Sequence, residues 1–134
     1  MKTSIDRDGR TVLHYAALEN NSAEVQRLLE AGFAAGDADK SGWTPLHFAA
    51  QGHSAGAVTL LIAHGAPVDA QDSHGNTPLS KAVFNSNGRG ELIQLLREAG
   101  ADPHRKNNYG VSPLSLARTI ANYDVRQFFN DIPE

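Results

Sequence analysis

The chain of 134 residues contains no cysteine, so disulfide bonds and thiolate metal sites are excluded. It also lacks an excess of positive charge. Its formal net charge of −3 argues against a nucleic-acid partner, which would need a basic footprint. No apolar run approaches the roughly 18 residues of a membrane span, and the N-terminal stretch becomes charged too soon for a secretion signal. We therefore expect one domain in the cytoplasm, with no membrane and no nucleic-acid contact.

The common signatures of catalysis and cofactor binding are also missing. The sequence has no cysteine nucleophile and no phosphate-binding Gly-x-x-x-x-Gly-Lys-Ser/Thr loop. Its six histidines include no pair in the His-Glu-x-x-His spacing of a zinc site. We expect a protein that is not an enzyme and that binds neither a cofactor nor a metal ion.

What the sequence does contain is a repeat. Glycine recurs at intervals of 33, 33 and 35 residues, at Gly9, Gly42, Gly75 and Gly110. Leucine keeps the same spacing, at Leu13, Leu46, Leu79 and Leu114. A second glycine series follows in phase, at Gly32, Gly65 and Gly100. Such a period indicates stacked repeats, each of which buries its apolar face only against its neighbours.

The clearest copy of the repeat is residues 39–50, Asp-Lys-Ser-Gly-Trp-Thr-Pro-Leu-His-Phe-Ala-Ala. Related stretches begin at residue 11 (Thr-Val-Leu-His-Tyr-Ala-Ala), at 77 (Thr-Pro-Leu-Ser-Lys-Ala-Val) and at 112 (Ser-Pro-Leu-Ser-Leu-Ala). With these motifs the chain resembles the ankyrin repeat family over about residues 6–130. The resemblance implies an all-α solenoid of four helix-turn-helix units joined by β-hairpin-like turns. We expect a single domain over residues 1–134, with repeats at about 6–38, 39–71, 72–106 and 107–134.

The local chemistry agrees with this fold. A Thr or Ser precedes each first helix, where its hydroxyl can cap free backbone N–H groups. Pro45, Pro78 and Pro113 follow at the first helical position, which tolerates a missing N–H. The second helices carry apolar residues at i, i+3 and i+4, and each ends at a glycine suited to a left-handed cap. An Asp-x-x-Gly pattern supplies the turn at the hairpins.

Several positions depart from the repeat. The third unit is two residues longer, and the excess falls in residues 85–90, between its helices. This insertion is either a tolerated surface loop or an element that reaches the partner with Arg89 at its tip. His53 stands where the family usually has glycine, and Gly52 one position earlier would shift the turn. We expect three apolar residues to close the C-terminal end of the core: Phe128, Phe129 and Ile132.

Histidines and aspartates within the repeat have structural explanations. The resemblance implies that His14 and His47 hydrogen-bond the backbone of the adjacent repeat, which accounts for both without a metal. Asp8, Asp39 and Asp72 are explained by the hairpin turns. A repeat solenoid also presents a shallow face, whereas most small ligands need a deep pocket.

The resemblance implies that a protein partner contacts the hairpin tips and the exposed face of the first helices. The repeat motif leaves several residues there unexplained, and we take them as candidates for partner binding: Glu19, Lys40, Ser41, Trp43, Gln51, His74, Asn76, Phe84, Arg89, Asn108 and Tyr109. The only tryptophan, Trp43, is either an interface anchor or packs over the neighbouring hairpin. Phe84 likewise faces either the partner or the core. Our hypothesis is a contact strip along the hairpin tips made of Trp43, His74 and Tyr109.

Composition and spacing lead no further than a protein partner. A short, stand-alone chain of this kind also resembles small bacterial ankyrin proteins, many of which are immunity proteins of secreted toxins. Residues 112–129 are similar to the terminal repeat of that group. This resemblance implies a stoichiometric inhibitor that occludes a toxin or effector and is a monomer when free. The alternative is a scaffold or adaptor for a housekeeping or host protein.

Overall fold

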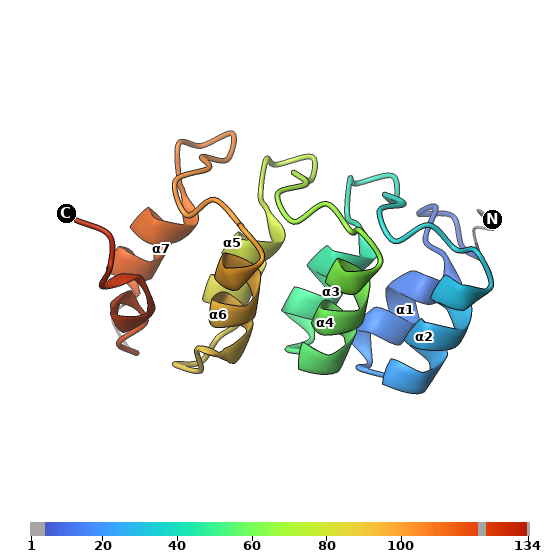
Figure 1. The fold of residues 1–134 in the computed structure, drawn as a ribbon. Helices are drawn as coiled ribbons and strands as arrows, with labels where there is room; N and C mark the ends of the chain where they lie inside the picture. Colours follow the sequence, from blue (N-terminus) through green and yellow to red (C-terminus); the bar gives the residue numbers. More distant parts are fainter. Residues whose placement is uncertain (1–4, 121–122, 134) are drawn as a thin grey trace.

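The computed structural model describes residues 5–120 and 123–133. Within these ranges the chain forms seven α-helices and one short 3₁₀ helix, and no strand. The helices stack in a row of tiers with α1 and α7 at opposite ends (Figure 1). Their bounds are α1 (Val12–Leu18), α2 (Ser22–Glu30), α3 (Pro45–Gln51), α4 (Ala55–Ala63), α5 (Pro78–Phe84), α6 (Glu91–Glu98), α7 (Pro113–Thr119) and η1 (Arg126–Phe129). Among them, no helix combines the length and the apolar character needed to cross a membrane.

Each first helix begins at the hydroxyl cap that the sequence predicts. The side chain of Thr44 accepts a hydrogen bond from the N–H of His47, and Ser112 does the same for Ser115. Thr11 and Thr77 cap α1 and α5 in the same way. Proline follows the cap in α3, α5 and α7, where its missing N–H leaves no bond unmade. The first helices are therefore set at fixed starting points along the stack.

Hairpins connect one tier to the next and project from one side of the stack (top in Figure 1). In the hairpin between α2 and α3, Oδ1 of Asp39 accepts the N–H groups of Ser41 and Trp43, each at 2.9 Å. The turn closes at Gly42, whose φ of +79° suits glycine. Backbone hydrogen bonds also link neighbouring hairpins, for example from Ser73 N to Ser41 O at 2.9 Å. The predicted hairpin-like turns are thus held both internally and to one another.

Apolar side chains fill the space between tiers. Leu13, Leu46 and Leu79 are fully buried, each with an exposed fraction of 0%. Small residues lie beside them and let the helices approach closely: Ala16, Ala17, Ala49, Ala50 and Ala82. First helices contact first helices, from α1 through α3 and α5 to α7, while α2, α4 and α6 form a second row. The core is therefore a continuous layer between two rows of helices.

Two buried histidines tie adjacent tiers together. Nε2 of His14 donates to the carbonyl oxygen of Trp43 at 3.0 Å, and Nε2 of His47 donates to that of Asn76 at 2.9 Å. In each ring Nδ1 accepts the N–H of the capping threonine three residues earlier. Burial lowers the pKa of both imidazoles, so the rings are neutral at pH 7 with the proton on Nε2. The expected role of these histidines is confirmed.

The turns between the two helices of a tier correct one expectation. His53 itself takes the left-handed conformation, with φ of +54°, whereas Gly52 has φ of −83°. The turn is therefore not shifted to the glycine. Gly52 is needed for a different reason, because a Cβ there would lie 2.2 Å from the carbonyl oxygen of Leu18. In the first tier Asn20 takes the left-handed position, with φ of +54°, which asparagine tolerates better than most residues.

The fourth unit differs from the predicted helix-turn-helix. After α7 the described chain forms only the single-turn η1 in place of a second α-helix. Asn130 and Asp131 have low helix propensity, and Pro133 disfavours a helical residue before it. Apolar burial is nevertheless achieved, as expected. Phe129 is only 2% exposed, and Phe128 and Ile132 pack against the core.

Candidate functional site

A groove of about 560 Å³ crosses the second, third and fourth tiers between the hairpins and the first helices. We call it the central groove and define it by its lining residues: Trp43, Gln51, Asn76, Ser80, Lys81, Phe84, Asn85, Asn107, Tyr109, Val111 and Leu116. Five of the candidates selected from the sequence are among them: Trp43, Gln51, Asn76, Phe84 and Tyr109. The fold therefore brings together residues that lie up to 66 positions apart in the chain.

Trp43 forms one wall of the central groove, but it is half-buried rather than a free anchor. Its ring centre lies 5.0 Å from that of Phe48 and 5.8 Å from that of His47. The indole thus packs on its own tier rather than over the neighbouring hairpin, and it still lines the groove. Its role as an interface anchor stays a prediction. A side chain held in this way loses little further freedom when a partner binds.

The ammonium group of Lys81 also packs against Trp43. Nζ of Lys81 lies 4.2 Å from the centre of the Trp43 ring and 3.4 Å from Oδ2 of Asp72. The Asp72 side chain is 0% exposed, and this oxygen accepts no hydrogen bond from the described residues. Lys81 therefore compensates a buried negative charge and stacks on the indole at the same time.

The same arrangement occurs one tier earlier with different residues. Nε of Arg10 lies 3.2 Å from Oδ2 of Asp39, and its guanidinium carbon lies 5.2 Å from the centre of the Phe48 ring. In the fourth hairpin, Asn107 stands in place of the aspartate and accepts the same two turn N–H groups. Its amide carries no charge, so no cation is required there.

Two exposed aromatic side chains form the rims of the central groove. Phe84 is 72% exposed and Tyr109 is 74% exposed, although large apolar side chains are usually buried. The ring of His74 stacks on Tyr109 with centres 6.3 Å apart and an angle of 26°. Of the hypothesised strip, Trp43 and Tyr109 share the groove, whereas His74 lies beside it at the hairpin tip.

Amide side chains supply the polar part of the groove. Nδ2 of Asn85 donates to Oε1 of Gln51 at 3.2 Å, and Nδ2 of Asn107 donates to Oδ1 of Asn76 at 2.9 Å. Each pair bridges two tiers. Lys81 is the only charged side chain among the described lining residues, and Asp72 offsets its charge. The site thus combines aromatic walls, neutral amides and no net charge.

The family model for ankyrin repeats (three copies) matches two overlapping stretches of the chain, residues 1–72 and 19–107. The chain belongs to the ankyrin repeat family. Ankyrin repeats are a fold of protein–protein interaction rather than of catalysis, so this ankyrin chain is an interaction module. A comparison with curated proteins finds no match.

Other predicted candidates lie on the ankyrin hairpins outside the groove. Lys40 donates its N–H to the carbonyl oxygen of Asp8 at 2.7 Å, and Asn108 donates its N–H to that of His74 at 2.9 Å. Ser41 accepts from the next hairpin in the same way. Their backbones join the hairpins, and all three residues are exposed at the tips. The Asn108 side chain adds a further link, because its Nδ2 donates to the carbonyl oxygen of Ser73 at 2.9 Å.

Two more candidates lie away from the central groove. Glu19 lines a separate hollow near the first tier, together with Ile5 and Tyr15. Arg89 belongs to the loop between α5 and α6. That loop lies on the side of the ankyrin stack opposite the hairpins (Figure 1). Nε of Arg89 donates to the carbonyl oxygen of Ser86 at 3.0 Å, which turns the side chain back on its own loop. The fold does not bring either residue to the groove.

The structure adds groove residues that the sequence analysis missed, foremost Lys81 and Leu116. Both stand four positions after the capping residue of a first helix, where Tyr15 and Phe48 stand in earlier tiers. The residue at this position differs in each of the four repeats, while the ankyrin motif around it stays nearly constant. That contrast could have identified it in the sequence as a candidate for partner binding. Asn107 was missed for a different reason, because it occupies the turn position of Asp39 and Asp72, which the motif explains.

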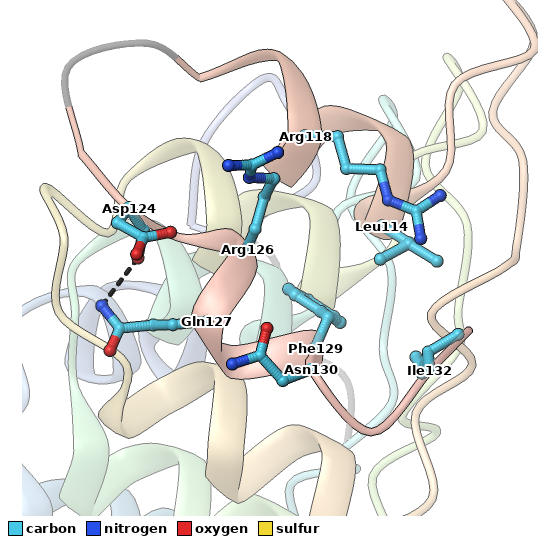
Figure 2. Close-up of a pocket in the computed structure, with 8 residues that line it drawn as sticks. All are labelled: Leu114, Arg118, Asp124, Arg126, Gln127, Phe129, Asn130 and Ile132. Carbon is cyan, nitrogen blue, oxygen red and sulfur yellow. Dashed lines mark hydrogen bonds between the residues drawn. The ribbon is translucent and has the colours of Figure 1, made fainter. Parts of the chain in front are cut away.

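A second hollow of about 300 Å³ lies at the C-terminal end of the ankyrin stack. Its lining combines apolar residues such as Phe129 and Ile132 with polar ones that include two arginines (Figure 2). Figure 2 shows the guanidinium groups of Arg118 and Arg126 pointing away from each other, so they do not converge on one ligand. Arg118 stands where Ala50 and Val83 are buried in earlier tiers, and it therefore gives the last tier a polar outer face.

One motif that invites a catalytic reading is explained by the fold. Residues 52–56, Gly-His-Ser-Ala-Gly, match the Gly-x-Ser-x-Gly pattern of a nucleophile elbow. An elbow follows a strand and exposes its serine, whereas this segment follows α3 and Ser54 is 0% exposed. The Ser54 hydroxyl donates to the carbonyl oxygen of Leu18 at 3.1 Å and joins two tiers. Across the described residues, no cluster of three potential metal ligands occurs either.

Proposed function

We propose that this ankyrin protein binds one partner protein through the central groove and inhibits it by occlusion, as an immunity protein does with a bacterial toxin or effector. The observation that supports this proposal is the preorganised groove itself. Its aromatic wall at Trp43 is fixed by Phe48 and Lys81 before any partner arrives. A surface that needs little ordering keeps more of its interaction energy for affinity, and a stoichiometric inhibitor requires high affinity.

The contact surface in this proposal consists of the groove residues together with the hairpin tips at Lys40, Ser41, His74 and Asn108. Exposed aromatic side chains such as Phe84 and Tyr109 are typical anchors of protein interfaces. The tips would contribute discrimination between partners, because the repeat motif does not specify their side chains. Glu19 and Arg89 are assigned to the periphery, since neither lines the groove.

Affinity capture from the source cell tests the proposal. The wild-type chain should retain one dominant partner in equal molar amount, and Phe84→Ala should lose it. Tyr123→Ala is the matched control, because Tyr123 is an exposed aromatic residue (46%) outside the groove lining. The purified partner should then lose its activity at one equivalent of the wild-type chain.

The alternative is an adaptor for a housekeeping or host protein. Many weakly held partners, or a partner whose activity is unchanged when bound, would favour the adaptor and refute inhibition. A partner retained equally by Phe84→Ala and by the wild type would refute the use of the groove.

A further inference from the structure

We infer that the central groove holds an extended, uncharged segment of the partner, with an apolar side chain inserted between Phe84 and Tyr109. This inference rests on the proposed function and specifies how the groove would be occupied. It depends on three features of the groove: unfilled hydrogen-bonding groups, exposed aromatic rims, and a compensated charge.

The first feature is hydrogen-bonding capacity left over within the groove. The two amide bridges use one donor and one acceptor from each pair. Nε2 of Gln51, Nδ2 of Asn76 and Oδ1 of Asn85 have no partner among the described residues. Together they offer both donors and an acceptor along one surface. An extended backbone presents C=O and N–H groups in alternation and needs such partners when it leaves water.

The second feature is the apolar surface. Phe84 comes from the end of α5 and Tyr109 from the fourth hairpin, so the rims stand on different tiers. Between them Val111 and Leu116 lie on the lining and are half-buried. The volume of about 560 Å³ falls within the range of roughly 300–1,000 Å³ of sites that enclose ligands. An apolar side chain of the partner would remove both rims from water.

The third feature is charge. The single cation of the lining, Lys81, is already paired with the buried carboxylate of Asp72. An acidic side chain entering the groove would lose its hydration and find a cation whose charge is compensated. A basic side chain would also lose its hydration and would find no carboxylate among the described lining residues. The groove therefore favours a segment that is neutral where it enters.

The experiment is selection of random 12-residue segments displayed on phage, using the full chain as bait. Wild-type chain should enrich segments with a central apolar residue flanked by uncharged ones. Phe84→Ala should weaken binding of the enriched segment at least tenfold by titration calorimetry, whereas Tyr123→Ala should not. Asp72→Asn frees the charge of Lys81, so selection on this variant should shift toward an acidic residue. Asn107 already performs the same turn function as an asparagine, so Asp72→Asn should fold.

An acidic consensus on the wild-type chain, or no change of consensus on Asp72→Asn, would overturn the inference. The same holds for binding that is equal in Phe84→Ala. If no segment is enriched while a captured partner still depends on Phe84, the groove binds a folded surface and only the inference fails. If capture is also independent of Phe84, the proposed function fails as well.

Discussion

At the scale of single residues, the interior of the stack contains groups that must be neutral or paired. His14 and His47 are fully buried, and each uses both ring nitrogens in hydrogen bonds. A second proton could only go to Nδ1, where it would break the bond from the threonine N–H. Burial lowers the pKa of both rings, so the folded state resists protonation that the unfolded state accepts.

Stability should consequently fall as the pH drops below about 6.5, the ordinary pKa of unfolded histidine. Above that pH the two histidines contribute their full share to the free energy of unfolding, because the rings are neutral in both the folded and the unfolded state. Below it, each of the two histidines removes up to about 1.4 kcal/mol per pH unit until its lowered folded pKa is reached. Urea unfolding at pH 7.5 and 5.5 measures the effect.

Replacing both His14 and His47 by Ser, the residue at the equivalent place in α5 and α7, should flatten this pH dependence. His104→Gln is the control, because His104 is exposed and lies in a hairpin. If His104→Gln flattened the curve and the double variant did not, the assignment to the buried rings would be wrong.

Lys81 is the second residue whose role can be isolated. Lys81→Met keeps much of the packing on Trp43 but leaves the Asp72 carboxylate buried without a cation. We expect a loss of about 2–3 kcal/mol in the free energy of unfolding, reduced from a fully buried pair because Lys81 is partly exposed. Adding Asp72→Asn should restore most of it, since the amide needs no counter-charge. Denaturant titrations of the single and double variants measure both effects, and a lack of restoration would contradict the pairing.

The hairpin aspartates Asp39 and Asp72 show what the sequence could and could not predict about single residues. Their Oδ1 atoms bond the turn as the Asp-x-x-Gly pattern predicts. The cation at Oδ2 could not be predicted, because Arg10 comes from the previous hairpin whereas Lys81 comes from the helix that follows. No fixed spacing links carboxylate to cation, so only the packed tiers reveal the pairs.

At the scale of elements, the repeat specifies the first helices more tightly than their connections. Hydroxyl caps and proline set where α3, α5 and α7 begin, and these starts were predictable from the motif. The connection after α3 was not, because Gly52 and His53 both invited the left-handed assignment. The close approach of two tiers determines which residue is glycine, since the backbone of Gly52 must lie against the carbonyl oxygen of Leu18. Such contacts between tiers leave no local pattern in the sequence.

The His53 position gives a prediction about this turn. A side chain with φ of +54° carries a conformational penalty of roughly 1–2 kcal/mol that glycine avoids. Part of the gain is lost because glycine has a more flexible unfolded state. We expect His53→Gly to raise the free energy of unfolding by about 0.5–1 kcal/mol, measured by urea titration at pH 7.5. Gly52→Ala, in the adjacent position, should instead destabilise the chain strongly. A destabilised His53→Gly would mean that the imidazole makes a contact worth more than the strain.

At the scale of the whole molecule, the stack is a series of tiers that each depend on their neighbours. The last tier is the least supported, since it has α7 and the short η1 in place of two α-helices. Arg97 of α6 clamps it with a two-point ion pair to Asp131, both distances 2.7 Å, and a bond to the carbonyl oxygen of Phe128. Phe129 is only 2% exposed, and its ring packs beneath the guanidinium group of Arg97.

Truncating the buried Phe129 side chain should therefore destabilise the C-terminal end of the stack before the other tiers. Phe129→Ala is expected to cost about 3–4 kcal/mol, with the loss concentrated at α7. Hydrogen exchange should show lower protection in residues 113–119 while residues 45–63 keep theirs. Tyr123→Ala, an exposed aromatic change in the same region, should leave the pattern unaltered. A uniform loss of protection along the chain would show that the tiers unfold as one unit instead.

The groove also belongs to this scale, because its residues come from three tiers and none of them makes it alone. Sequence analysis found the aromatic rims by asking which residues the motif leaves unexplained. It left the burial of Trp43 open, and it did not find that Asn107 would hydrogen-bond Asn76. Those outcomes depend on how one tier lies on the next.

The place of Trp43 has a practical consequence. It is the only tryptophan of the chain, and its indole lies in the groove wall beneath the ammonium group of Lys81. The tryptophan emission of the protein therefore originates from a single point at the candidate site. A ligand that enters the groove changes the polarity around that fluorophore, so the emission spectrum reports occupancy without any label.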